Sequence, residues 1–404
     1  MKKKEKWMKF RHKVVWFLLR PILTLITLIK FPIHVKLHYD SFRRPYLILF
    51  NHQTSFDQFF VAMAFKGPIY FVATEDIMSN GLISRIIKWA AAPIAIKKQA
   101  GDFSAVLTTL RVAREGATIA MSPEGNRTYS GKTEHINPAI AGLAKKMKLP
   151  IALYRIEGGY GMEPRWSNVT RRGKRMKGYV ARVIEPEEYA PMSNKELYDQ
   201  ICRELYVDEG VVDGPFRSAK KAEYLERAVY VCPFCGLSGF ESHGNEAECQ
   251  TCHRKITYGE DKTISGVGYE FPFRFMTQWY DYQAEYMNGL DVTQIVHQPA
   301  FRDRAKMSEV ILNRRKQILR KAAELSLYGD RVVIDEGREA ELTLAFADMT
   351  AVSVLGRNKL NIYYGSSVYQ FKGSKRFNAL KYVHFYYRHK NITRGELDNH
   401  FLGL

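Results

Sequence analysis

Two polar side chains stand where an apolar strand gives way to a helix, in the stretch from Leu47 to Asp57. His52 follows the apolar run, and Asp57 comes five residues later. At such a turn a carboxylate can accept one imidazole N–H, which fixes the tautomer and raises the basicity of the other ring nitrogen. That nitrogen can remove a proton from a hydroxyl. On motif grounds a His beside an Asp is more often structural, so a second motif is needed to support a general base.

That second motif lies downstream, after the apolar stretch 117–121, and reads Ser-Pro-Glu-Gly-Asn-Arg-Thr over residues 122–128. Gly125 permits close approach of the backbone to a ligand. Arg127 is a planar fork suited to a phosphate. An Asn-His-x4-Asp turn followed by a Pro-Glu-Gly-x-Arg loop resembles the glycerolipid acyltransferase family, whose best-known members make phosphatidic acid from lysophosphatidic acid. The resemblance covers about residues 30–200.

The resemblance implies that His52 is the general base and that Asp57 orients it. It also implies an acceptor site built from Lys98, Glu124, Gly125, Asn126 and Arg127. Lys98 stands where the family usually has Arg, which keeps the charge and loses the fork. The implied reaction moves an acyl chain from a coenzyme A or acyl carrier protein thioester to 1-acylglycerol 3-phosphate, directly and without a catalytic cofactor. We interpret Ser55 as a helix cap and not as a nucleophile.

Two alternatives stay open. In the first, the chemistry is the same and the acceptor is another lysophospholipid or glycerol 3-phosphate. In the second, the chain is a non-enzymatic adaptor that binds lipid or nucleic acid through its basic charge and its additional domains. The intact residues of the two motifs favour the enzyme, and we expect no nucleic-acid partner.

Four of the five cysteines form one cluster, as Cys232 with Cys235 and Cys249 with Cys252. Each pair has two residues between its members, and thirteen residues separate the pairs. Each pair can offer two thiolates to one tetrahedral Zn²⁺, and the pattern resembles a zinc ribbon. Four cysteines complete the coordination shell, so we predict a structural zinc in a protein of a reducing compartment.

The formal net charge of +19 favours an anionic partner. Eight of the first twenty residues are Lys or Arg, and an apolar run from Val14 to Ile33 follows them. Because Arg20 and Pro21 interrupt this run, we expect a helix lying in the interface of an anionic phospholipid membrane, not a spanning helix. Trp7 and Trp16 would lie near headgroup level; the alternative is an ordinary helix packed on the domain. We expect the cytoplasmic face of a bacterial cell membrane, where thioester donors are available.

Strands alternate with helices over residues 36–212, which predicts an α/β fold with a mixed, largely parallel sheet flanked by helices. Both motifs would then lie in loops at one edge of the sheet, where ligand crevices form. The Gly- and Arg-rich segment 158–178 is either a phosphate or membrane contact or a solvated hairpin tip, and Met162 and Trp166 favour the membrane. The predicted strands are 35–39, 46–50, 69–73, 94–96, 117–121, 151–156 and 179–184, and the predicted helices are 58–65, 81–91, 103–115, 139–148 and 193–207.

The remaining chain suggests further domains. After a long basic helix over 302–324, we expect short strands and a closing helix over 375–388, an α+β module that resembles a pleckstrin-homology-like or GRAM-like domain and binds lipid headgroups or proteins. The predicted division is a membrane-associating helix (1–35), the acyltransferase domain (36–212), a linker (213–228), the zinc ribbon (229–262), an aromatic connector (263–300) and the C-terminal module (301–404).

Overall fold

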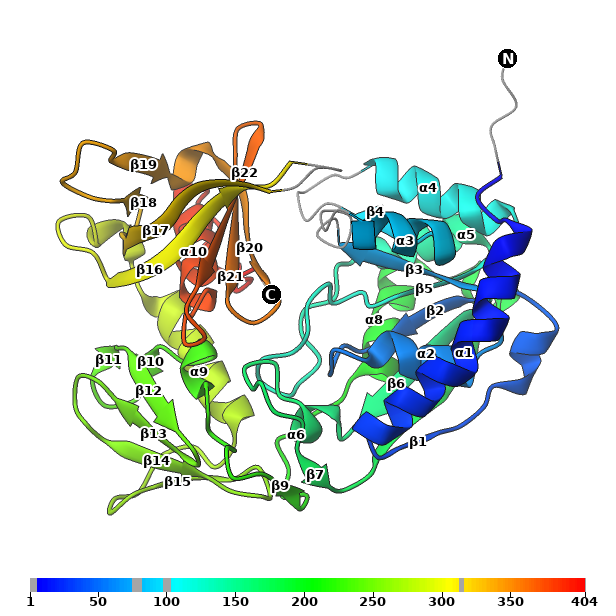
Figure 1. Ribbon diagram of the computed structural model, residues 1–404, viewed down its shortest axis with the longest axis horizontal. Coiled ribbons are helices and arrows are strands. Elements are labelled where there is room, and N and C mark those ends of the chain that lie inside the picture. Colours follow the sequence, from blue (N-terminus) through cyan, green and yellow to red (C-terminus); the bar gives the residue numbers. More distant parts are fainter. Residues whose placement is uncertain (1–5, 75–81, 97–102, 312–315, 404) are drawn as a thin grey trace. The chain divides into compact units, whose positions relative to one another are not determined.

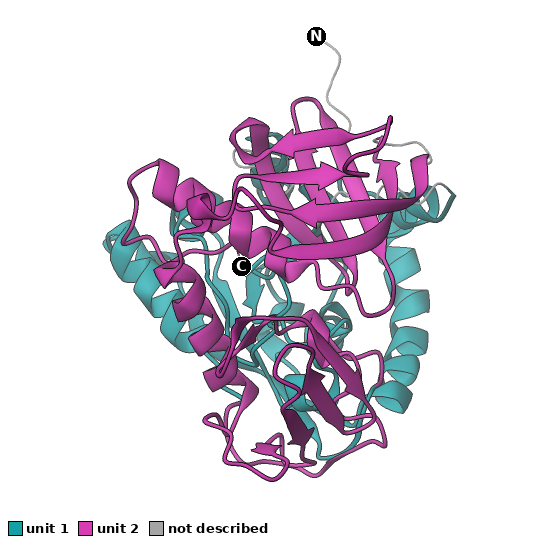
Figure 2. Ribbon diagram, turned by 90° about the vertical axis from the view of Figure 1, so that its left-hand side faces the viewer, with its two compact units in different colours: residues 1–97, 101–164, 170–209 teal, residues 98–100, 165–169, 210–404 magenta. Residues whose placement is uncertain are grey.

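The computed structural model describes residues 6–74, 82–96, 103–311 and 316–403. These residues form two compact units, coloured separately in Figure 2. The first contains the described residues up to 164 together with 170–209, and the second contains 165–169 and 210–403. Both sequence motifs lie in the first unit, and the four clustered cysteines lie in the second.

A seven-stranded sheet forms the centre of the first unit, with the order β1-β8-β6-β2-β5-β3-β4 (Figure 1). Neighbouring strands are parallel except β6 and β8, which are antiparallel. The predicted α/β fold with a mixed, largely parallel sheet is therefore confirmed. The strands are β1 (Ile33–Val35), β2 (Leu47–Phe50), β3 (Ile69–Thr74), β4 (Ile94–Ile96), β5 (Thr118–Met121), β6 (Ile151–Glu157) and β8 (Met176–Ile184), and a short β7 (Arg172–Gly173) lies outside this sheet.

Helices pack on the sheet in two groups. The first group contains α1, which packs on α2 and α3, and the second contains α5, which packs on α4 and α8. Every residue of β2 is buried, as expected for a central parallel strand covered on both faces. The helices are α1 (Phe10–Lys30), α2 (Asp57–Ala64), α3 (Leu82–Ala90), α4 (Phe103–Arg114), α5 (Ala139–Met147), α6 (Gly159–Met162), α7 (Pro186–Tyr189) and α8 (Asn194–Leu205).

The helix predicted near the start of the chain is present as α1, which runs without a break through Arg20 and Pro21. By length and composition it is apolar enough to cross a membrane. The two tryptophans predicted at headgroup level instead contact the domain. The indole N–H of Trp7 donates to the carbonyl of Ala92 at 3.0 Å, and the ring of Trp16 lies directly on Gly67.

Part of the segment 158–178 packs into the protein interior. The side chains of Met162, Trp166 and Arg171 are all fully buried. Trp166 packs edge-to-face on Tyr258, with ring centroids 5.6 Å apart. The expected membrane contact through Met162 and Trp166 is therefore wrong, because an indole or thioether in the protein interior has no access to lipid.

The second unit begins with small antiparallel sheets. The hairpin β10–β11 carries the first cysteine pair, and a four-stranded sheet in the order β12-β13-β14-β15 carries Cys249 at the end of β13. The segment predicted as a linker contains β9 and a short 3-10 helix, in which Leu225 and Arg227 are buried. The elements are β9 (Phe216–Arg217), β10 (Val231–Cys232), β11 (Gly236–Leu237), β12 (Phe240–His243), β13 (Glu246–Cys249), β14 (Lys255–Tyr258), β15 (Ile264–Gly266) and α9 (Met276–Gly289).

A seven-stranded antiparallel sheet in the order β19-β18-β17-β16-β22-β21-β20 ends the chain together with α10, which packs on β20. The predicted basic helix over 302–324 is wrong, because β16 and β17 form an antiparallel pair there. Arg302, Arg304 and Lys306 are exposed at every second position, which is the period of a strand. The elements are β16 (Phe301–Glu309), β17 (Gln317–Leu327), β18 (Arg331–Ile334), β19 (Leu342–Ala345), β20 (Met349–Leu355), β21 (Lys359–Tyr364), β22 (Ser367–Gly373) and α10 (Leu380–Thr393).

Candidate active site

The predicted His–Asp pair is formed in the structure. His52 Nδ1 lies 2.7 Å from Asp57 Oδ2, and the carboxylate is fully buried at the first residue of α2. The same carboxylate accepts the backbone N–H groups of Gln53 and Thr54 and the hydroxyl of Thr54, at 2.7 to 3.0 Å. A carboxylate held by this many donors at a helix N-terminus is fixed in place.

This bond determines which nitrogen of His52 can act as a base. A carboxylate only accepts, so Nδ1 carries the proton and Nε2 keeps its lone pair. The His52 side chain is 25% exposed, which leaves the ring accessible from one side. The structure thus supplies the geometry of a general base, and the catalytic role of His52 and Asp57 stays a prediction.

The turn that carries the pair is tied to the neighbouring β6 strand and α6 helix. The Asn51 side chain exchanges two hydrogen bonds with the backbone of Ile156, at 2.8 and 2.7 Å, and Gln53 Oε1 accepts the N–H of Tyr160 at 2.7 Å. A Cβ on Gly159 would lie 2.6 Å from Gln53 Cβ, so only glycine fits against the turn. Supports of this kind hold a catalytic side chain in one geometry.

Glu124 connects the two motifs. Its Oε1 accepts the N–H of His52 at 2.7 Å, and its Oε2 accepts the N–H of Glu134 at 2.8 Å. Burial raises the pKa of this carboxyl to about 8. The two backbone hydrogen bonds act to lower the pKa, but burial has the larger effect. Sequence reasoning placed Glu124 in the acceptor site; in the structure its carboxylate positions the backbone of the His52 turn.

The other residues predicted to bind the acceptor differ in backbone conformation and burial. Gly125 has φ +69°, and a Cβ there would meet nothing within 4 Å, so the left-handed backbone explains this glycine better than close approach does. Asn126 is half-buried in the same loop. Lys98 lies outside the described residues.

Arg127 is nearly buried and faces Glu163, a residue that the sequence reading missed. Arg127 Nη2 donates to the Glu163 backbone carbonyl at 3.0 Å, and Nη1 lies 3.7 Å from the Glu163 carboxylate. Ser55 is not the helix cap that was predicted; its hydroxyl donates to the same carboxylate at 2.7 Å. Glu163 is 108 residues from Ser55 in sequence, so no local spacing signals the contact.

The four clustered cysteines form a candidate metal centre in the second unit. All four sulfurs lie within 4.8 Å of one another, with Cys232–Cys252 at 3.7 Å and Cys235–Cys249 at 3.5 Å. Sulfurs about 2.3 Å from a tetrahedral zinc are about 3.8 Å apart, so the donor set fits Zn²⁺.

The local backbone explains how each cysteine pair turns. Gly236 and His253, which directly follow the second cysteine of each pair, both have positive φ. His253 Nδ1 lies 3.1 Å from Oε1 of Glu248, so this side chain interacts outside the sulfur cluster. The candidate site is thus made by thiolates alone.

Comparison with known proteins agrees with the site. Residues 33–155, which contain both motifs, match the family model described as Acyltransferase. The crystal structure of the 1-acyl-sn-glycerophosphate (LPA) acyltransferase PlsC from Thermotoga maritima is similar over 49% of this chain and 83% of that chain, at 17% identity and a TM-score of 0.40. A comparison with curated proteins gives no match. The family match supports the resemblance seen in the two motifs: residues 33–155 contain an acyltransferase domain.

Proposed function

We propose that this protein is a membrane-associated acyltransferase that converts 1-acylglycerol 3-phosphate to phosphatidic acid with an acyl thioester. The observation that carries the proposal is the 2.7 Å contact between His52 Nδ1 and the buried carboxylate of Asp57, within a domain that matches the acyltransferase family. A base oriented in this way suits proton removal from an acceptor hydroxyl.

The proposed reaction is a direct transfer. His52 Nε2 takes the proton of the acceptor hydroxyl as its oxygen attacks the thioester carbonyl. The tetrahedral intermediate collapses, the carbon–sulfur bond breaks, and the departing thiolate receives the proton from His52. Asp57 stabilises the imidazolium that exists between these two steps. The products are the ester and a free thiol of coenzyme A or acyl carrier protein.

Arg127 is the described residue best suited to the acceptor's phosphate. It is a cation that does not lose its charge at physiological pH, and its guanidinium can form two parallel bonds to a phosphate. We assign Lys98 to the same phosphate group. The acyl donor is a thioester of coenzyme A or of acyl carrier protein. The net charge of +19 suits either polyanionic donor.

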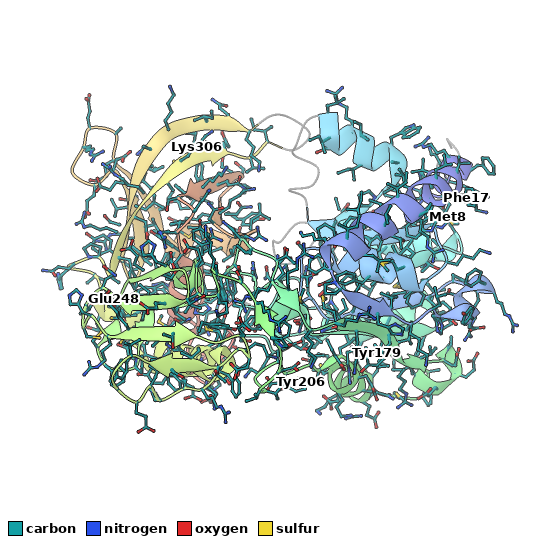
Figure 3. The ribbon with its side chains drawn as sticks, turned by 60° about the horizontal axis from the view of Figure 1, so that its bottom comes forward. Met8, Phe17, Tyr179, Tyr206, Glu248 and Lys306 are labelled. Atoms are coloured by element: carbon teal, nitrogen blue, oxygen red, sulfur yellow. The ribbon has the colours of Figure 1, made fainter. Side chains whose placement is uncertain are left out.

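The arrangement of α1 supports membrane association. Its outward face is apolar along its whole length, and Phe17 (Figure 3) is 78% exposed. A surface of this size on a single helix is rare in proteins that contact only water. The exposed apolar residues of α1 are Phe10, Val14, Phe17, Leu18, Leu19, Ile22, Leu25, Ile26, Leu28 and Ile29.

The inward face of α1 is the polar one. His12 pairs with the hydroxyl of Tyr70 at 3.0 Å, and Arg20 donates to the carbonyls of Ala62 and Met63 at the end of α2, both at 3.0 Å. These bonds hold the helix along the domain, so the proposal places α1 in the plane of one leaflet and not across the bilayer.

Two further helices of the first unit support the same membrane contact. Both α3 and α4 expose apolar side chains, and none of the residues of α1, α3 or α4 is acidic. A surface that combines exposed apolar groups with Lys and Arg suits anionic phospholipids. The exposed apolar residues are Leu82, Ile83, Ile86 and Trp89 on α3, and Phe103, Val106 and Leu107 on α4.

We also propose that the cysteine cluster binds one structural Zn²⁺. The proposed location of the enzyme is the cytoplasmic face of a bacterial cell membrane. Four thiolates leave no open coordination position for chemistry. Thioester donors are cytosolic, which favours that face of the membrane. The lipid or protein ligand of the C-terminal module stays a prediction.

The test measures release of free thiol from an acyl thioester with 1-acylglycerol 3-phosphate presented in vesicles. We expect release that requires the lysolipid and that falls at least about 100-fold in His52→Ala, the loss typical of a general base. Glycerol 3-phosphate and other lysophospholipids serve as competing acceptors. If the folded, zinc-loaded protein releases no thiol with any of them, the proposal is refuted and a non-enzymatic adaptor is favoured.

A further inference from the structure

We infer that Glu163 is the positioning residue that holds Arg127 and the His52 turn together, and that it thereby sets the preference for a phosphate-bearing acceptor. The inference rests on the proposed function, because it assigns Arg127 to the acceptor's phosphate. Neither of the two sequence motifs includes Glu163, which lies between α6 and Pro164.

The first contact joins Glu163 to the catalytic turn. Its Oε2 accepts the Ser55 N–H at 2.8 Å and the Ser55 hydroxyl at 2.7 Å. Ser55 lies between His52 and Asp57 in the chain. A change of the Glu163 carboxylate would therefore affect the backbone that carries both residues. Two short bonds from one residue fix the position of that residue more firmly than one bond would.

The second contact joins Glu163 to Arg127. The guanidinium bonds the Glu163 backbone carbonyl at 3.0 Å and lies 3.7 Å from the carboxylate. The Arg127 side chain is 13% exposed and that of Glu163 is 2% exposed, so this ion pair is shielded from water. Attraction between opposite charges is strong in such a setting, and a long side chain is held in one orientation by it.

The third contact brings in α1. Lys30, the last residue of that helix, lies 3.4 Å from Glu163 Oε1. Burial acts to raise the pKa of Glu163, but the charge of Arg127 and the two Ser55 bonds outweigh it, and the net shift is downward. Glu163 is therefore ionised at neutral pH. Lys30 and Arg127 thus both approach this one carboxylate.

This arrangement predicts an effect on acceptor choice and not only on rate. Without the carboxylate, Arg127 keeps its charge and loses the partner that orients it. A phosphate-bearing acceptor should then lose more than a neutral acceptor that has the same hydroxyl. A purely structural role for Glu163 would affect both acceptors to the same extent.

The experiment compares 1-acylglycerol 3-phosphate with monoacylglycerol in the full-length protein. The measured quantity is the ratio of kcat/KM for the two acceptors, from thiol release with vesicles. For Glu163→Gln we expect the ratio to fall about 10- to 100-fold, mainly through KM of the phosphate-bearing acceptor, which is the range for one lost charge-assisted hydrogen bond. Glu163→Asp keeps the charge and should recover part of the ratio.

Three variants complete the design. Arg127→Met should lower the ratio at least as much as Glu163→Gln does, and the double variant should lower it no further than Arg127→Met, because Glu163 acts through Arg127. The matched control is Glu157→Gln, which changes a carboxylate of the same unit that accepts the hydroxyl of Tyr179 at 2.6 Å. It should leave the ratio unchanged.

The outcomes separate the inference from the proposed function. Absence of thiol release from the unchanged protein overturns both. Release that Glu163→Gln slows equally with the two acceptors overturns the inference alone. If Glu163→Gln does not fold, Glu163→Asp with Arg127→Met carries the same test, and an unchanged ratio in Glu163→Asp together with a reduced ratio in Arg127→Met overturns the role of the carboxylate geometry.

Discussion

Replacing Asp57 by Asn tests whether this carboxylate works through His52. The side chain keeps its shape, but one oxygen becomes an NH₂ group. If the NH₂ took the Oδ2 position, it would face the imidazole N–H of His52 and the backbone N–H of Gln53. If it took the Oδ1 position, it would face the backbone N–H of Thr54. In either orientation at least one buried donor loses its acceptor, and the imidazolium loses its negative partner.

The expected magnitude follows from these contacts. An unpaired buried donor costs about 1–3 kcal/mol of stability. Loss of a positioned base and its charged partner costs about 100- to 10,000-fold in kcat. We therefore expect Asp57→Asn to remain folded at 25 °C with a lower melting temperature, and to lose at least about 100-fold in kcat for thiol release.

The assay combines thiol release, thermal melting and the double variant with His52→Ala. If Asp57 acts through His52, the double variant should be no slower than His52→Ala alone, because the single change already removes the function. An Asp57→Asn protein that melts lower and keeps kcat within about tenfold would refute the reasoning. A double variant slowed by the product of the two single effects would do the same.

Three further changes have defined outcomes. Cys235→Ser should abolish the binding of one zinc per chain, measured by metal analysis, and should lower the melting temperature of the second unit; an unchanged protein without zinc would contradict this. The pKa of Glu124 rises from its usual 4.5 to about 8 on folding, so the native state binds a proton that the unfolded state releases between these values. Stability should therefore fall as pH rises through this window, by up to about 1.4 kcal/mol per pH unit, and denaturant melts of Glu124→Gln should show a flatter profile. Phe17→Glu should weaken binding to anionic vesicles about 10- to 100-fold in a sedimentation assay, whereas Leu397→Glu, at a site 60% exposed in the second unit, should not.

Features with short sequence separation could be predicted. His52 and Asp57 are five residues apart at a strand-to-helix turn, so their contact follows from local geometry. The cysteine spacing likewise indicates the sulfur cluster, because each pair is one tight turn. The mixed sheet followed from the alternation of apolar strands with amphipathic helices.

Features that depend on distant partners could not. The carboxylates of Glu124 and Glu163 meet backbone or side-chain donors 72 and 108 residues away, and no periodicity reports such a contact. The strand pair β16–β17 is different, because the alternation of Arg302, Arg304 and Lys306 is a local signal of a strand, and the predicted helix over 302–324 does not fit it. The inward bonds of Arg20 to the carbonyls of Ala62 and Met63 are tertiary as well, and no local pattern in the sequence indicates them.

The Arg20 contacts have a practical consequence for producing the protein. Removing α1 would leave the carbonyls of Ala62 and Met63 without their donor and would uncover the hydroxyl of Tyr70. We therefore expect a form without α1 to be less stable than the complete domain. Polar substitutions at outward positions such as Phe17 and Leu25 change only the exposed side of the helix, so they are the better route to a detergent-free preparation.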